Sequence, residues 1–199
     1  MQQILVFNKW PCEGITVQDP GLERYITISP IMVPKTGARY AGQKFYKSRI
    51  NIVERLINRL MTPGHKAKKH KVTSGHTTGK ATTVYNLVFQ ALAIVERKTK
   101  KNPVEVLVKA IENGAAREEI ITIEYGGARY PKAVEASPQR RIDQVLKLLA
   151  QSSYQKSFNS KKGAASVLAE EIILAYQANP NSIIISKKLE LERQADSSR

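Results

Sequence analysis

The stretch Ile121–Arg141, with the sequence ITIEYGGARYPKAVEASPQRR, carries two kinds of secondary-structure signal in close succession. Apolar and polar residues alternate on both sides of Gly126-Gly127, which is typical of two strands joined by a tight turn at positive φ. Pro138, directly after Ser137, then marks the first turn of a helix. The stretch therefore predicts a β-hairpin that leads straight into an α-helix.

The hairpin is predicted to span residues 117–136 and to project as an isolated ribbon. Its register places Glu124 opposite Arg129 across the ladder. Pro131 removes a backbone donor that a strand inside a larger sheet would need. A lone two-stranded ribbon is only marginally stable in water, so we expect it to lean on the helices or on a ligand.

On both sides of the hairpin, apolar residues recur three and four positions apart, which predicts about six helices. The fold class is therefore mainly α, a helical bundle with one projecting two-stranded β-hairpin and an extended N-terminal arm. The expected helices run from Ile50 to Met61, Val84 to Lys98 and Pro103 to Asn113, then from Pro138, from about Ser160 to Asn179, and briefly after Ser186.

The first 45 residues have a different character from the rest. Eight prolines and glycines interrupt them and leave no room for long helices. We expect residues 1–45 to form an extended arm laid over the core, with a strand near Tyr25 to Ile28. Residues 46–199 are expected to form a single helical domain that includes a lysine-rich loop, 65–80, and the hairpin.

Positive charge is concentrated in one part of the chain. The formal net charge is +15, and residues 46–101 hold thirteen Lys and Arg against only Glu54 and Glu96. Unpaired charge on this scale repels itself unless a polyanion neutralises it, and a nucleic-acid backbone is the commonest such partner. The alternative is a basic surface that serves solubility, for which acidic residues are better suited.

Several basic positions are candidates for phosphate contact. The pairs Arg140-Arg141 and Lys161-Lys162 are expected in the first turns of helices, where cations oppose the dipole unless an anion binds there. The predicted rRNA-binding residues are Arg39, Lys44, Lys47, Arg49, Arg55, Arg59, Lys66, Lys68, Lys69, Lys71, Lys80, Arg140, Arg141, Lys161 and Lys162.

The hairpin tip is a candidate for a different kind of contact. Two tyrosines and a guanidinium at the end of a ribbon could stack on bases or hold a strand. An ordinary hairpin, with Tyr130 packed on Ile123, is the alternative. The residues concerned are Tyr125, Gly126, Gly127, Ala128, Arg129, Tyr130 and Lys132.

We expect no catalytic site, no metal and no cofactor. The segment from Gly75 to Thr82 imitates a phosphate-binding loop, but it has one residue too few between its glycines, and Ala81 replaces the hydroxyl that would hold magnesium. The three histidines lie among lysines, which would repel a divalent cation. The lone Cys12 and the absence of a long apolar run fit a cytoplasmic protein.

The order of these motifs resembles the family of small-subunit ribosomal protein seven, in its archaeal and eukaryotic branch. The resemblance covers roughly residues 52–199. It is carried by IVERLINRLM (52–61), GKATTVYNLVFQALAIVERKT (79–99), NPVEVLVKAIENG (102–114), YGGARYPKAVEASPQRR (125–141) and LERQADSSR (191–199).

The resemblance implies a non-enzymatic, primary rRNA-binding protein of the cytoplasmic ribosome that organises the 3′ major (head) domain. It implies that the hairpin lies near mRNA and exit-site tRNA, with neighbouring ribosomal proteins as further partners. Bacterial members carry arginines before the glycine pair, where this chain has Glu124-Tyr125, so Arg129 and Lys132 become the expected basic contacts of the hairpin.

Two other function classes stay open. A helical protein that binds double-stranded DNA would need a recognition helix with Asn, Gln or Arg directed at base edges and, usually, a dimer interface. An RNA-modifying enzyme would need a cofactor pocket, for which the sequence offers no glycine-rich strand-to-helix motif.

Overall fold

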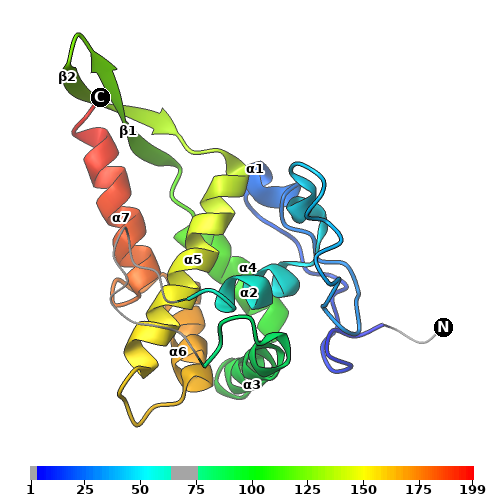
Figure 1. Cartoon of the computed structure of the whole chain (residues 1–199). Coiled ribbons are helices and arrows are strands. Elements are labelled where there is room, and N and C mark those ends of the chain that lie inside the picture. The colour runs from blue at the N-terminus through cyan, green and yellow to red at the C-terminus, as the bar shows by residue number, and fades with distance from the viewer. Residues whose placement is uncertain (1–3, 64–75) are drawn as a thin grey trace.

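The computed structural model describes residues 4–63 and 76–199, and its architecture is mainly α, as predicted (Figure 1). A short helix lies in the arm, six helices form the body, and the only sheet among the described residues is the hairpin. The elements are α1 (Pro20–Glu23), the 3-10 helix η1 (Tyr46–Arg49), α2 (Ile52–Leu60), α3 (Ala81–Thr99), α4 (Pro103–Gly114), β1 (Glu118–Tyr125), β2 (Ala128–Glu135), α5 (Pro138–Ser157), α6 (Ala164–Tyr176) and α7 (Ile183–Asp196).

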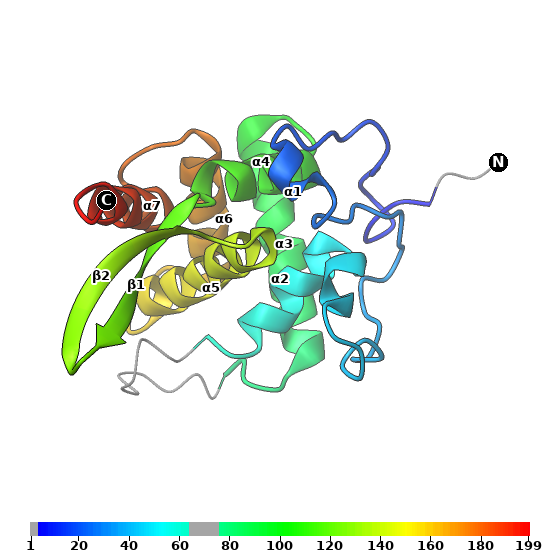
Figure 2. The ribbon, with the colours of Figure 1, turned by 90° about the horizontal axis from the view of Figure 1, so that it is seen from above.

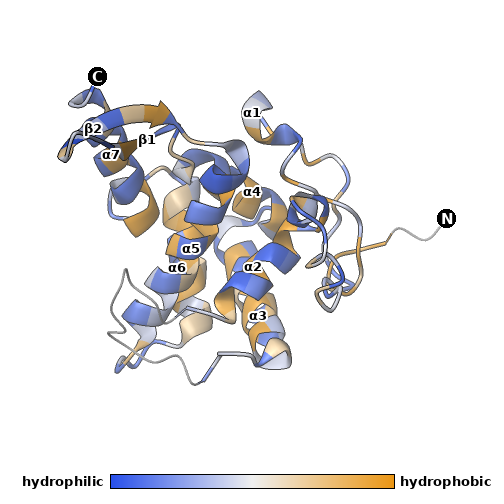
Figure 3. Ribbon diagram, turned by 45° about the horizontal axis from the view of Figure 1, so that its top comes forward, coloured by the Kyte–Doolittle hydropathy of each residue, from blue (hydrophilic) through white to orange (hydrophobic). Residues whose placement is uncertain are grey.

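The body is built around α6. This helix packs against α3, α4 and α5, and Leu168 and Ile172 at its centre are fully buried. Seen from above, α6 lies among the other helices while α2 covers one side of the bundle (Figure 2). Helices α2 and α5 each carry both hydrophilic and hydrophobic residues, as expected of helices with one face in a core (Figure 3). No helix in the described ranges is long and apolar enough to cross a membrane.

Local signals set several helix ends as predicted. Asn102 caps α4 by accepting a hydrogen bond from the Val104 N–H at 3.0 Å, and Pro103 is its first residue. The predicted starts of the last two helices were wrong. Helix α6 begins at Ala164, so Lys161 and Lys162 precede it, and α7 begins at Ile183 because the Ser182 hydroxyl accepts from the Ile184 N–H at 3.3 Å.

The hairpin has the predicted register, with Glu124 opposite Arg129 and Ile123 opposite Tyr130. Its turn glycines, Gly126 and Gly127, have φ angles of 58° and 80°, which glycine adopts without strain. The ribbon projects beyond the bundle beside the C-terminal half of α7, and α7 packs against β1 (Figure 1). It therefore leans on a helix, as expected.

The arm is laid over the bundle and contributes to its core. Val6, Trp10 and Leu22 are almost fully buried in the main apolar cluster. The strand predicted near Tyr25 to Ile28 is reduced to a single parallel bridge between Thr27 and Asn51. Proline and glycine spacing leaves segments too short for a ladder, so side-chain burial holds the arm in place instead.

Candidate nucleic-acid interface

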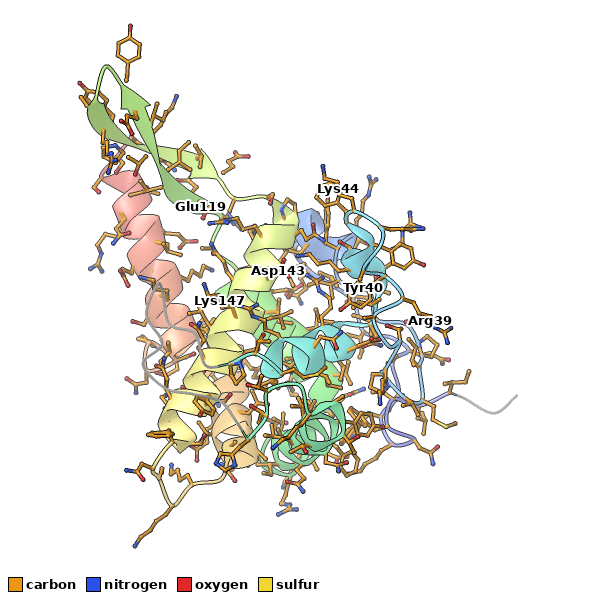
Figure 4. The ribbon with its side chains drawn as sticks, in the orientation of Figure 1. Arg39, Tyr40, Lys44, Glu119, Asp143 and Lys147 are labelled. Atoms are coloured by element: carbon orange, nitrogen blue, oxygen red, sulfur yellow. The ribbon has the colours of Figure 1, made fainter. Side chains whose placement is uncertain are left out.

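A cleft of about 600 Å³ lies between the arm, the η1–α2 segment and the first half of α5. In Figure 4, Tyr40, Arg39 and Lys44 lie on the arm, while Asp143 and Lys147 project from α5. The charged side chains that line the cleft are Lys47, Arg55, Arg59, Arg140, Lys147 and Asp143. Five cations against one carboxylate leave a lining charge of +4.

The N-terminus of α2 is fixed to the arm by Asn51. Its side-chain oxygen accepts from the Val53 N–H at 2.9 Å and caps the helix, while its amide donates to the Ser29 carbonyl at 2.7 Å. The Ile52 N–H donates to the Thr27 carbonyl at 3.0 Å. These bonds hold the basic residues of α2 at a defined position against α5.

Asp143 organises the inner end of the cleft. Its carboxylate accepts from the Arg55 guanidinium at 2.9 Å and pairs with the Lys47 ammonium. The Arg55 side chain is 4% exposed and also donates to the Tyr25 carbonyl at 2.9 Å. Arg55 is therefore engaged inside the fold, although the sequence placed it among the phosphate contacts.

Arg59 and Lys147 are the residues best placed to meet a ligand in the cleft. Lys147 is exposed, and the Arg59 Nε is buried without a hydrogen-bond partner among the described residues. The cleft also contains Tyr40, whose hydroxyl accepts from the Asn58 amide at 3.1 Å. Sequence reasoning missed Tyr40 and Lys147, yet Lys147 follows Arg140 by two helical turns and so shares its face of α5.

Arg140 and Arg141 are adjacent in sequence but have different environments. The Arg140 side chain is 59% exposed and its Nε lies 2.5 Å from a Glu119 oxygen. The Arg141 side chain is 9% exposed, and it donates to Asp19 at 2.7 Å and to the Ala116 carbonyl at 3.2 Å. Arg141 therefore joins the arm to the bundle, whereas Arg140 faces the cleft.

The environment of Asp19 favours its ionised form. Burial alone raises the pKa of this carboxyl, but hydrogen bonds from Arg141 and from the Gly21 N–H, with the nearby positive charge, outweigh burial. The net pKa of Asp19 is lowered from its ordinary value, so the bridge to Arg141 is charged at neutral pH.

The other predicted basic residues are spread around the cleft or lie far from it. Arg39, Lys44 and Arg49 are exposed on the arm and η1, and Lys80 is exposed at the N-cap of α3. Lys161 and Lys162 are exposed beyond the far end of α5, about 30 Å of helix away from its start. The loop lysines Lys66, Lys68, Lys69 and Lys71 lie outside the described residues.

The hairpin has little positive charge to offer a phosphate backbone. Its strands carry four glutamates against Arg129 and Lys132, and Arg129 lies 3.5 Å from Glu124. Its exposed surface also presents aromatic side chains, since Tyr125 is 82% and Tyr130 58% exposed. The predicted hairpin contacts thus differ in chemistry from those in the cleft.

Comparison with known proteins gives one consistent result. The sequence model of the family described as ribosomal protein S7p/S5e matches residues 22–199. Over 194 residues the chain is 48% identical to the small ribosomal subunit protein uS7 of Nanoarchaeum equitans, with 98% of each chain covered. Over 198 residues it is 42% identical to the small ribosomal subunit protein uS7 of Archaeoglobus fulgidus, covering 100% of this chain and 96% of the relative. These matches confirm the resemblance inferred from the motifs, and the chain belongs to the ribosomal protein S7p/S5e family.

Proposed function

We propose that this protein is a structural, non-catalytic constituent of the small ribosomal subunit and that it binds rRNA through the basic cleft. The observation that carries the proposal is the cleft between the arm, α2 and α5, whose lining has a net charge of +4. The proposal also agrees with the family to which the chain belongs. Cations on backbone segments that are already ordered neutralise phosphates, while the folded shape of the RNA supplies specificity.

The contacting set within the described residues is Arg39, Lys44, Lys47, Arg49, Arg59, Lys80, Arg140, Lys147, Lys161 and Lys162. Arg55 and Arg141 support this surface from inside, because each has a carboxylate partner and little exposure. Lys66, Lys68, Lys69 and Lys71 add to the same basic region of the sequence.

We also assign the cleft and the hairpin to positions within the small subunit. The cleft binds the 3′ major (head) domain of the rRNA, and the hairpin lies near mRNA, exit-site tRNA and neighbouring ribosomal proteins. The charge of the two surfaces supports this division, because the cleft is cationic while the hairpin is acidic overall with exposed aromatic and aliphatic side chains.

The decisive experiment measures affinity for an RNA fragment of the 3′ major domain across a salt series. Lys147→Gln removes one exposed cation from the cleft, so we expect weaker binding and a salt slope smaller by about 1. Arg193→Gln is the matched control, because it removes one exposed charge from α7, outside the cleft. Equal effects of the two variants would contradict the assignment of the cleft.

A further inference from the structure

A second hollow, of about 260 Å³, lies beside the cleft on the outer surface of η1. Three aromatic and three cationic side chains line it, and its lining contains no carboxylate. The aromatic residues are Tyr25, Phe45 and Tyr46, and the cations are Arg24, Lys44 and Arg49.

Phe45 is the unusual residue of this hollow. Its side chain is 66% exposed, so its ring gains little from the core of the protein. Its backbone has φ 62°, in the left-handed region that bulky side chains rarely adopt. An exposed ring held at an unfavourable backbone angle contributes nothing evident to the fold, and such features concentrate where a ligand uses them.

The cations in the hollow are arranged around the rings. The Lys44 ammonium lies 5.3 Å from the centre of the Phe45 ring, and the Arg49 guanidinium carbon lies 5.4 Å from the centre of the Tyr46 ring. Aromatic faces flanked by cations are what an unstacked nucleobase and its own phosphate require. Bases inside an A-form helix are stacked and their major groove is too narrow to read, so only an unpaired base could reach these rings.

We propose that the Phe45 hollow is a stacking site for one unpaired nucleobase of the bound RNA, with Lys44 and Arg49 holding the adjoining phosphate. The inference rests on the proposed function, since it specifies how a single-stranded segment of that RNA is held. It also distinguishes two modes of binding on one surface: charge neutralisation in the cleft and stacking on the outer surface of η1.

The test compares variants of the full chain on the same 3′ major domain RNA fragment. Phe45→Leu removes the ring but no charge, so affinity should fall about tenfold or more while the salt slope stays unchanged. Phe45→Trp should restore binding, and Lys44→Gln should reduce the salt slope by about 1. Wild-type affinity in Phe45→Leu would overturn the stacking site.

Two further measurements keep this result separate from folding and from the proposed function. Phe45→Gly suits φ 62°, so it should lose affinity without a lower melting temperature. A photoreactive benzoylphenylalanine at position 45 should crosslink to an unpaired nucleotide; crosslinks confined to paired nucleotides or to protein in assembled subunits would overturn the inference. If wild-type affinity itself does not depend on salt, the proposed function fails instead.

Discussion

At the scale of single residues, burial decides whether a basic side chain supports the fold or faces a ligand, since the more exposed Lys47 and Arg140 also pair with carboxylates. Arg55 and Arg141 look like their neighbours in sequence, but each is buried against a carboxylate, Asp143 and Asp19 respectively. Those partners lie 88 and 122 residues away along the chain. No local pattern reveals such pairs, which is why the sequence grouped both arginines with the exposed ones.

The Asp19–Arg141 bridge gives a prediction for stability. Asp19→Asn should lower the free energy of unfolding at pH 7 by about 1.5 kcal/mol, because a charged hydrogen bond to a buried guanidinium is lost. The folded-state pKa of Asp19 is lowered, so the stabilisation that it provides is present above its unfolded pKa of about 4 and is lost as the pH falls through the folded-state value. Urea unfolding of both proteins from pH 7 to pH 2.5 measures this difference.

The control for that series is Glu190→Gln. Lys187 lowers the pKa of Glu190, yet this pair is exposed on α7, so its loss should leave stability nearly unchanged. A wild-type advantage over Asp19→Asn that persists undiminished at pH 2.5 would contradict the charged bridge.

At the scale of elements, the close approach of α4 and α7 depends on Gly114. A Cβ added there would lie 2.3 Å from the Cγ2 of Ile184, a branch next to the backbone that cannot move away. Gly114→Ala should therefore destabilise the protein by about 1–3 kcal/mol through overpacking. The measurement is equilibrium urea unfolding, with Gly42→Ala as the control because open space surrounds that position.

A double-mutant cycle identifies the cause of that loss. Ile184→Ala removes the obstructing methyl group, so the double variant should lose less stability than the sum of the two single variants. Strict additivity would show that the cost of Gly114→Ala comes from elsewhere.

The hairpin should be dispensable for rRNA binding. Deleting Tyr125–Tyr130 should leave affinity for the rRNA fragment intact, because the phosphate contacts are assigned to the cleft, and should impair the retention of exit-site tRNA or mRNA by assembled subunits. A triple substitution of Tyr125, Arg129 and Tyr130 by serine keeps the glycine turn and serves as the variant with an unaltered fold. Loss of rRNA binding in either protein would show that the division of roles is wrong.

Only some features of the elements could be predicted from the sequence alone. The hairpin register and the start of α4 depend on signals within a few residues, and both were predicted. The prediction misplaced the start of α7. Its N-cap, Ser182, lies in a loop, and the apolar residues show no helical periodicity before the helix begins. The cleft and the Phe45 hollow were beyond sequence reasoning, since the cleft forms only where the arm, α2 and α5 meet and the hollow only where Arg24 and Tyr25 meet the segment around η1.

At the scale of the whole molecule, the charge is segregated. Residues 46–101 carry most of the net charge of +15, while the hairpin carries more acid than base. The ribbon lies beside α7 (Figure 1), whereas the basic cleft lies between the arm, α2 and α5. One molecule can thus bind a polyanion on one side and present elsewhere an acidic ribbon with exposed aromatic and aliphatic side chains.

This segregation predicts how the whole chain should discriminate between nucleic acids. The net charge of +4 in the cleft alone contributes a salt slope of about −3 to −4 on any phosphate backbone. The contacting cations outside the cleft make the slope steeper, and this electrostatic contribution gives no preference between nucleic acids. Preference for RNA should come from a cleft whose shape matches folded RNA and from a hollow that accepts an unpaired base. Duplex DNA offers neither that folded shape nor an unpaired base. In competition at matched salt, a 3′ major domain RNA fragment should therefore displace duplex DNA of equal length, and more completely as the salt concentration rises.

Two variants separate the sources of this preference. Phe45→Leu should reduce the ratio of RNA affinity to DNA affinity, whereas Lys147→Gln should weaken both complexes alike. Equal affinity for the two nucleic acids at every salt concentration would instead favour a general duplex-binding protein.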